Sequence, residues 1–181
     1  PFRPYHDTDA ARLKLFGFMR EQIKAGRQVY VVYPLIKESE KMDYKDLYDG
    51  FESLSRDFPL PQYRITACHG KMRPEDKDAA MMEFKRGEAH ILVATSVIEV
   101  GVDVPNATVM VIESAERFGL SQLHQLRGRV GRGGEQSYCI LMSGEKLSKE
   151  SRQRLEAMCA TNDGFELSEL DLKLRGAGDI H

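Results

Sequence analysis

The sequence predicts an α/β fold in which a parallel sheet is covered by helices on both faces. Strand-like and helix-like segments alternate from the start of the chain to about residue 143, the order that produces parallel sheets. Most of about five strand-like segments are continuous apolar runs, too apolar to have one face in water. We therefore expect a sheet whose strands are buried on both sides.

Composition is that of a globular protein. The 181 residues are 41% hydrophobic and 30% charged, which suits one domain with room for an appendage. The net charge of -2 predicts no bulk attraction to a polyanion, so any nucleic-acid binding must come from local patches. No apolar run approaches the length of a membrane span. The start, residues 1–4, is typical of a linker and not of a signal peptide.

The cysteines indicate a reducing compartment. Three cysteines lie far apart and form no CxxC pair: Cys68, Cys139 and Cys159. An odd, scattered set favours reduced thiols in a cytoplasmic protein. No histidine and cysteine cluster has the spacing of a metal site, so we expect no protein-held metal.

The first helix and strand are predicted from the spacing of apolar residues and from residues that begin or end a helix. A helix capped by Asp7 or Thr8 is expected to run to about Ala25, where Gly26 ends it. Four residues keep its helical period: Leu13, Phe16, Arg20 and Ile23. The apolar run 29–36 then predicts a buried strand.

A charged loop, a helix and a short strand come next. Residues 37–43 predict the surface loop, and residues 46–58 predict a helix that ends before prolines. Residues 64–68 predict a strand that leads into His69-Gly70. Pro74 then begins a third helix, which Gly87 ends. Its expected apolar side consists of Ala79, Met82 and Phe84.

Three further strands are expected at 91–94, 109–112 and 138–142, with short helices at 95–100 and 120–126. Ligands of parallel sheets bind at the carboxyl ends of the strands. Candidate polar residues fall at those ends or in loops that we place in the same series: His69-Gly70, Thr95, Glu113-Ser114 and the arginine stretch 125–133. We interpret Glu113 as an ordinary strand end, although a carboxylate there faintly resembles a Mg²⁺ ligand.

The stretch 125–133 holds three arginines and three glycines in nine residues. Arg129 and Arg132 lie three apart, so on a continuing helical turn they would point the same way. Their planar guanidinium groups suit phosphate oxygens. A basic surface turn without function is the alternative interpretation of this stretch taken alone.

The machinery that holds a nucleotide is missing from the sequence. Gly70-Lys71 is not a P-loop, because Ile65 stands where the first glycine belongs and Met72 where a serine or threonine belongs. An arginine finger can be supplied from another domain. The arginine stretch therefore predicts half of a composite phosphoryl-transfer site.

The stretch 93–105 fits such a site. Thr95 begins a predicted short helix, where free N–H groups favour a phosphate. Gly101 and Asp103 follow that helix, and the carboxylate could accept a hydrogen bond from a ribose hydroxyl. An ordinary helix cap at Thr95 and a turn carboxylate at Asp103 remain alternatives.

The tail differs from the sheet region. Residues 148–160 and 166–174 predict two helices joined by a turn, followed by a basic exit at 175–178. We divide the chain into a sheet domain, 1–143, and the start of a helical hairpin, 144–181.

Residues 94–103 and 125–132 resemble motifs V and VI of superfamily 2 helicases, and 118–133 is closest to the RecG branch. Residues 34–40 are similar to that branch's motif IV region, and 162–165 with 171–178 to its translocation motif. The resemblance covers nearly the whole chain, and motif VI is highly specific. It implies the second RecA-like motor domain of an ATP-dependent DNA helicase that remodels branched DNA.

The resemblance also implies roles for residues. Arg129 and Arg132 would contact the γ-phosphate of ATP, with Gln125 helping to place them. Gly101 and Asp103 would lie near the ribose of the nucleotide, and the DNA backbone would be held by His69, Gly70 and Thr95. Arg154 and Arg175 would couple ATP hydrolysis to movement along DNA. ATP with Mg²⁺ would be held mainly by an N-terminal RecA-like domain. That domain and a wedge domain would precede Pro1, and the translocation motif would continue past His181.

Alternatives to the RecG-type motor domain are another translocase, a non-catalytic binding module and a self-contained NTPase. A transcription-repair coupling translocase shares motif VI and the hairpin, but His124 and 163–165 favour the RecG branch. A non-catalytic nucleic-acid-binding module would not need two finger arginines. A self-contained NTPase ranks last, because the sequence contains no P-loop.

Overall fold

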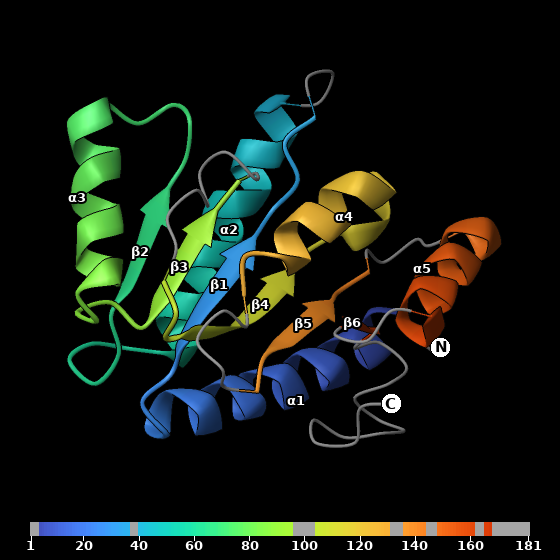
Figure 1. Cartoon of the computed structure of the whole chain (residues 1–181), viewed down its shortest axis with the longest axis horizontal. Coiled ribbons are helices and arrows are strands. Elements are labelled where there is room, and N and C mark those ends of the chain that lie inside the picture. The colour runs from blue at the N-terminus through green and yellow to red at the C-terminus, as the bar shows by residue number, and fades with distance from the viewer. Residues whose placement is uncertain are drawn as a thin grey trace.

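The computed structural model of the chain describes residues 4–36, 40–95, 104–130, 136–143, 148–161 and 165–167. Its framework is a six-stranded sheet in the order β2-β3-β1-β4-β5-β6, and every neighbouring pair is parallel (Figure 1). The strands are β1 Gln28–Val32, β2 Ile65–Cys68, β3 Ile91–Ala94, β4 Ala107–Ile112, β5 Tyr138–Leu141 and β6 Phe165–Leu167. The predicted parallel α/β fold is confirmed, with one strand more than the five expected.

Helices cover both faces of this sheet. They are α1 Pro4–Lys24, α2 Glu40–Asp57, α3 Pro74–Lys85, the 3-10 turn η2 Ala115–Arg117, α4 Leu120–Arg127 and α5 Lys149–Thr161. Along β1, Val29 and Val31 pack against α1 and α2. Tyr30 and Val32 pack against the opposite layer, which contains α3, η2, α4 and α5. This alternation follows from the two-residue period of a strand.

The register of the sheet aligns the ends of five strands. Cys68 pairs with Ala94, Ala94 with Val32, Val32 with Ile112, and Ile112 with Leu141. The next residue of each strand therefore lies in one row along the carboxyl edge: His69, Thr95, Tyr33, Glu113 and Met142. Backbone bonds extend the ladder into this row, including Glu113 N–H to the Val32 carbonyl at 2.8 Å.

Several expected boundaries are wrong. Helix α1 begins at Pro4, so Asp7 and Thr8 lie inside it and do not cap it. Leu13 is 67% exposed, since the buried side of α1 is formed by other apolar residues: Ala11, Leu15, Phe16, Phe18 and Met19. The strand expected over 29–36 ends at Val32.

The loop expected over 37–43 is also wrong in its second half, because α2 begins at Glu40. Asp43 is buried there, although a charged stretch predicted exposure. Its carboxylate accepts from the Ile36 N–H at 2.7 Å and pairs with Arg117 at 2.7 Å. These two partners compensate the carboxylate for its loss of water.

The expected apolar side of α3 is partly wrong. Ala80 and Phe84, which are four apart, face the core, with Met81 partly buried beside them. Met82 is 42% exposed, and Ala79 also faces solvent. Packing against the sheet chose between adjacent apolar residues, because the run 79–82 consists of four apolar residues in a row and periodicity alone does not say which of them are buried.

The tail gives a mixed result. The first tail helix is confirmed as α5, and Leu155 is buried in the same cluster as α4. The second helix, expected over 166–174, is wrong at its start because Phe165–Leu167 forms β6 beside β5. The rest of that prediction lies outside the described residues. The division into 1–143 and 144–181 stays a prediction.

None of the helices in the described part of the chain is both long and apolar enough to cross a membrane.

Candidate functional site

The carboxyl edge brings together two of the predicted sites. His69 directly follows β2 and Thr95 directly follows β3, and these strands pair through Cys68 and Ala94. Gly70 follows His69 and is exposed. The three residues predicted to hold a nucleic-acid backbone therefore lie on adjacent strands at one edge, where parallel sheets bind ligands.

The side chain of His69 is used inside the chain. Its imidazole is 3% exposed and lies edge-on between two tyrosines of α2, with ring centroids 5.1 Å from Tyr44 and 5.4 Å from Tyr48. Nδ1 accepts from the Lys71 N–H at 3.2 Å, and Nε2 lies 2.6 Å from the Tyr48 hydroxyl. Since Nδ1 accepts, the neutral ring carries its proton on Nε2 and donates it to Tyr48. His69 thus shapes the loop and does not offer its ring to a ligand.

Thr95 is fully buried at the end of β3. This burial fits the cap interpretation as well as a phosphate at the following backbone, so the structure keeps both open. Residues 96–103 lie outside the described part of the chain. The proposed short helix and the predicted ribose contacts Gly101 and Asp103 therefore stay predictions.

Helix α4 positions the described part of the arginine stretch. Gln122 accepts the Gly119 N–H at 2.9 Å and so caps the start of the helix. Leu123 and Leu126 are buried, which turns Gln125 outward to solvent. Exposure of Gln125 on the helix is compatible with a ligand contact, and its role beside the arginines stays a prediction.

The expected continuing helical turn is wrong. Helix α4 ends at Arg127, and Gly128 with Arg129 forms a turn in which Arg129 N–H bonds the Leu126 carbonyl at 2.9 Å. This stretch also leads toward the amino end of β5, so it is not one of the loops that leave a strand's carboxyl end. Arg129 is half-buried, and Arg132 lies outside the described residues.

Arg154 of α5 holds the turn that precedes α4. Its guanidinium donates to the carbonyls of Glu116 at 2.7 Å and Phe118 at 3.2 Å. Because α4 starts two residues after Phe118, Arg154 links the tail to the helix that carries Gln125. The other predicted coupling residue, Arg175, lies outside the described residues.

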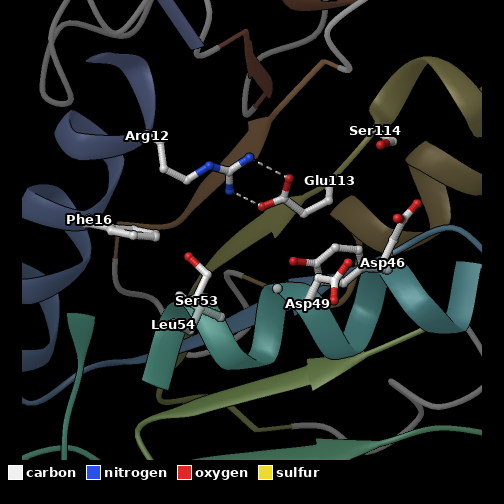
Figure 2. A pocket seen from close by; sticks show the side chains of 10 residues that line it. Arg12, Phe16, Asp46, Asp49, Ser53, Leu54, Glu113 and Ser114 are labelled. Atoms are coloured by element: carbon white, nitrogen blue, oxygen red, sulfur yellow. Dashed lines mark hydrogen bonds and ion pairs between the residues drawn. The ribbon is translucent and has the colours of Figure 1, made fainter. Parts of the chain in front are cut away.

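A pocket of about 600 Å³ opens on the other face, between α1 and α2 (Figure 2). Both oxygens of Glu113 accept from the Arg12 guanidinium, one of them at 3.0 Å. Asp46 and Asp49 also line it, so carboxylates outnumber the single guanidinium. Burial, and then the nearby charge of Asp43, raise the pKa of Asp46. This acidic pocket does not suit a polyphosphate, and Glu113 serves as an ion-pair partner at a strand end, as interpreted.

Tyr33 contributes an apolar wall to that pocket. Its hydroxyl lies against the backbone of Gly50, a position without a side chain. Burial, and then the charge of Glu113, raise the pKa of the Tyr33 hydroxyl far above its usual range. The phenol therefore stays neutral.

Comparison with known proteins decides the family. A protein-family model described as "Helicase conserved C-terminal domain" matches residues 12–134. The chain belongs to this helicase C-terminal domain family. The match contains both the carboxyl-edge loops and α4.

Individual relatives narrow the family further. The chain is 52% identical over 167 residues to the ATP-dependent DNA helicase RecG of Bacillus subtilis, a match that covers 92% of this chain and 24% of the relative. It is 50% identical over 173 residues to that of Synechocystis, covering 96% and 21%. A solved structure titled "Structure of RecG bound to three-way DNA junction" superimposes with a TM-score of 0.66 at 46% identity, covering 91% and 21%.

The likeness to RecG helicases over most of the chain confirms the resemblance that the motifs implied, and the RecA-like fold with it. The chain spans about a fifth to a quarter of the length of these relatives.

Sequence reasoning missed three residues of this helicase domain's edge: Tyr44, Tyr48 and Lys71. Tyr44 and Tyr48 are four apart on α2, so they share one helix face, and this spacing could have found them. Arg127 was likewise unassigned, and within the described residues its buried Nε has no hydrogen-bond partner.

Proposed function

We propose that this chain is the C-terminal motor domain of a RecG-type ATP-dependent DNA helicase, which remodels branched DNA such as stalled forks and Holliday junctions. Identity of 50–52% with RecG helicases over more than nine-tenths of the chain carries the proposal. The similar RecG structure is bound to a three-way DNA junction, which supports branched DNA as the substrate.

In this proposal the chain supplies half of the ATPase site. Its sequence has no P-loop, so an N-terminal RecA-like domain of the same protein holds most of the ATP and its Mg²⁺. Arg129 and Arg132 act as arginine fingers on the γ-phosphate, with Gln125 placing them. Gly101 and Asp103 lie near the ribose. The outward position of Gln125 on α4 supports this arrangement.

DNA lies along the carboxyl edge of β2 and β3, where Gly70 and Thr95 approach its backbone. His69 takes part by holding the loop, because both of its ring nitrogens are engaged within the chain. A wedge domain elsewhere in the full-length protein meets the branch point. Cys68 and Cys139 are buried and form no disulfide in the described residues, which supports a cytoplasmic location for the enzyme.

Coupling runs through the tail, which we propose as a unit beginning at residue 144. Arg154 connects α5 to the turn before α4, and Arg175 acts further along the tail. Two carbonyl contacts from one guanidinium support the first of these links. An element that both sites bias is what coupling requires.

The rival functions receive less support. A transcription-repair coupling translocase shares the motor motifs, but RecG helicases share about half of the aligned residues with this chain. A non-catalytic binding module would not require an outward Gln125 beside finger arginines.

A substitution at Arg132 tests the proposal in the full-length enzyme. Arg132→Lys keeps the positive charge but loses the planar fork, so ATP affinity should stay within about threefold while turnover falls by roughly 10³-fold or more. The measurements are nucleotide affinity by equilibrium titration and DNA-stimulated ATP hydrolysis. Arg86→Lys, at the exposed end of α3, is the matched control.

Turnover within about threefold of wild type would show that Arg132 is not the finger, leaving Arg129 to carry that role. A structural role would instead lower thermal stability, with affinity and turnover falling together. Absence of any DNA-stimulated hydrolysis in the wild-type protein would reject the helicase function itself.

A further inference from the structure

The loop after β2 has a hydrogen-bond pattern that leaves one backbone donor, on an exposed residue, without a partner inside the loop. Of the N–H groups at residues 69–72, three are used inside the loop. The His69 N–H donates to the Met72 sulfur at 3.4 Å, the Lys71 N–H to His69 Nδ1, and the Met72 N–H to the His69 carbonyl at 3.1 Å. Within the described residues, the N–H of exposed Gly70 is the one without such a bond.

Lys71 places a cation beside that donor. Its ammonium nitrogen lies 4.5 Å from the centroid of the Tyr44 ring, a cation–π contact that restrains an otherwise flexible side chain. In the described part of the chain no carboxylate forms an ion pair with Lys71. The neighbouring Arg73, by contrast, pairs with Asp76 at 3.1 Å. The charge of Lys71 is therefore available to an anion.

From this geometry we propose that Lys71 is a further contact to a DNA phosphate, acting with the Gly70 N–H, and that Tyr44 and Tyr48 are positioning residues for it. The inference rests on the proposed function, since DNA is the ligand. An N–H and an ammonium group from two adjacent, exposed residues match a phosphate, which accepts several hydrogen bonds.

The two tyrosines act through His69. Tyr48 accepts from Nε2, which leaves Nδ1 as the acceptor that orients the Lys71 amide. Tyr44 packs against the same imidazole and also carries the ammonium of Lys71 on its ring. One face of α2 thus sets both the backbone and the side chain of the loop.

The first test removes the cation from the full-length protein. Lys71→Ala should weaken binding of a three-way DNA junction and lower the slope of log affinity against log salt by about 1. The ratio of wild-type to variant affinity should then shrink about threefold between roughly 50 and 200 mM salt. Lys71→Arg should restore most of the slope. The control is Lys24→Ala, an exposed lysine at the opposite edge.

The second test removes only a hydroxyl. Tyr48→Phe keeps the ring and loses the bond to His69, so the DNA concentration for half-maximal ATP hydrolysis should rise about two- to tenfold. The maximal rate at saturating DNA should not change, because the ATPase residues are untouched. The control is Tyr63→Phe, which removes the hydroxyl of a tyrosine that precedes the amino end of β2. This variant should behave as wild type.

The outcomes separate this inference from the function beneath it. If wild type binds the junction and Lys71→Ala keeps its affinity and salt slope, the phosphate contact is rejected while the helicase function stands. Equal behaviour of Tyr48→Phe and Tyr63→Phe rejects the positioning role. If wild type neither binds junctions nor hydrolyses ATP with them, the proposed function fails first.

Discussion

His69 and Glu113 both follow buried strands, and the polar atoms of both side chains bond to other residues of the chain. His69 bonds Tyr48 and the Lys71 amide, and Glu113 pairs with Arg12. Beside His69, the exposed Gly70 and Lys71 are the groups that we propose for a DNA phosphate. In that proposal the buried polar residue sets the shape of the loop, and its exposed neighbours make the contact.

Gly50 illustrates how one residue fixes local packing. An added Cβ there would lie 1.7 Å from the Tyr33 hydroxyl oxygen, so Gly50→Ala should destabilise the protein by about 1–3 kcal/mol despite better helix propensity. Gly17→Ala, in α1 with nothing within 4 Å, should instead stabilise by roughly 0.5–1 kcal/mol. Urea unfolding of both variants checks this, and a stabilised Gly50→Ala protein would contradict it.

His90 should give stability a dependence on acid pH. Burial, and then the charge of Arg64, lower the pKa of its imidazole below the ordinary 6.5. The unfolded chain then binds that proton more readily, so stability is present above pH 6.5 and falls as the pH drops below it.

The asparagine variant His90→Asn does not titrate and can still accept the Arg64 N–H, which wild type donates to Nδ1 at 3.0 Å. The variant should lose less stability than wild type between about pH 7 and pH 5, measured by urea unfolding. Parallel losses in the two proteins would remove His90 as a contributor.

At the level of elements, α5 and the turn η2 connect the tail with α4. Arg154 reaches two carbonyls of the segment 116–118, and Leu155 buries its side chain in the cluster that includes Leu123 and Leu126. The contact is polar at the turn and apolar beneath it. A displacement of α5 would therefore act on the start of α4.

Arg154→Ala should separate hydrolysis from movement in the full-length enzyme. DNA-stimulated ATP hydrolysis should largely survive, while junction unwinding falls by up to about 30-fold, equivalent to a coupling free energy of about 2 kcal/mol. The control Arg152→Ala affects an arginine on the same helix that lies 4.0 Å from Glu156. Proportional losses of hydrolysis and unwinding would refute the coupling role.

For the molecule as a whole, the chain by itself should not hydrolyse ATP. In our proposal it supplies arginines for the γ-phosphate, but its sequence has no P-loop lysine to position the phosphates for attack. Phosphate release by the purified chain, with and without junction DNA, should equal that of a mock preparation. DNA-stimulated release above that background would show that the half-site proposal is wrong.

The sequence by itself determined the parallel α/β fold, because buried strands are continuous apolar runs in the sequence and helices show a 3.6-residue period of apolar residues. It also identified the helicase family, because motif VI is specific in residue type and spacing. Helix ends were harder to predict. Helix α2 begins at Glu40 and includes the buried Asp43, whose partners Ile36 and Arg117 lie outside the helix.

Only the tertiary structure decided which polar groups remain free for a ligand. His69 looks like a ligand contact in the sequence, but α2 folds over β2 and brings Tyr44 and Tyr48 onto its ring. Similarly, Glu166 and Leu167, the first two residues of an expected helix, became part of β6 because β5 offered an edge to pair with. Hydrogen bonds between segments far apart in the chain depend on how those segments are arranged in space. Local sequence patterns do not specify that arrangement.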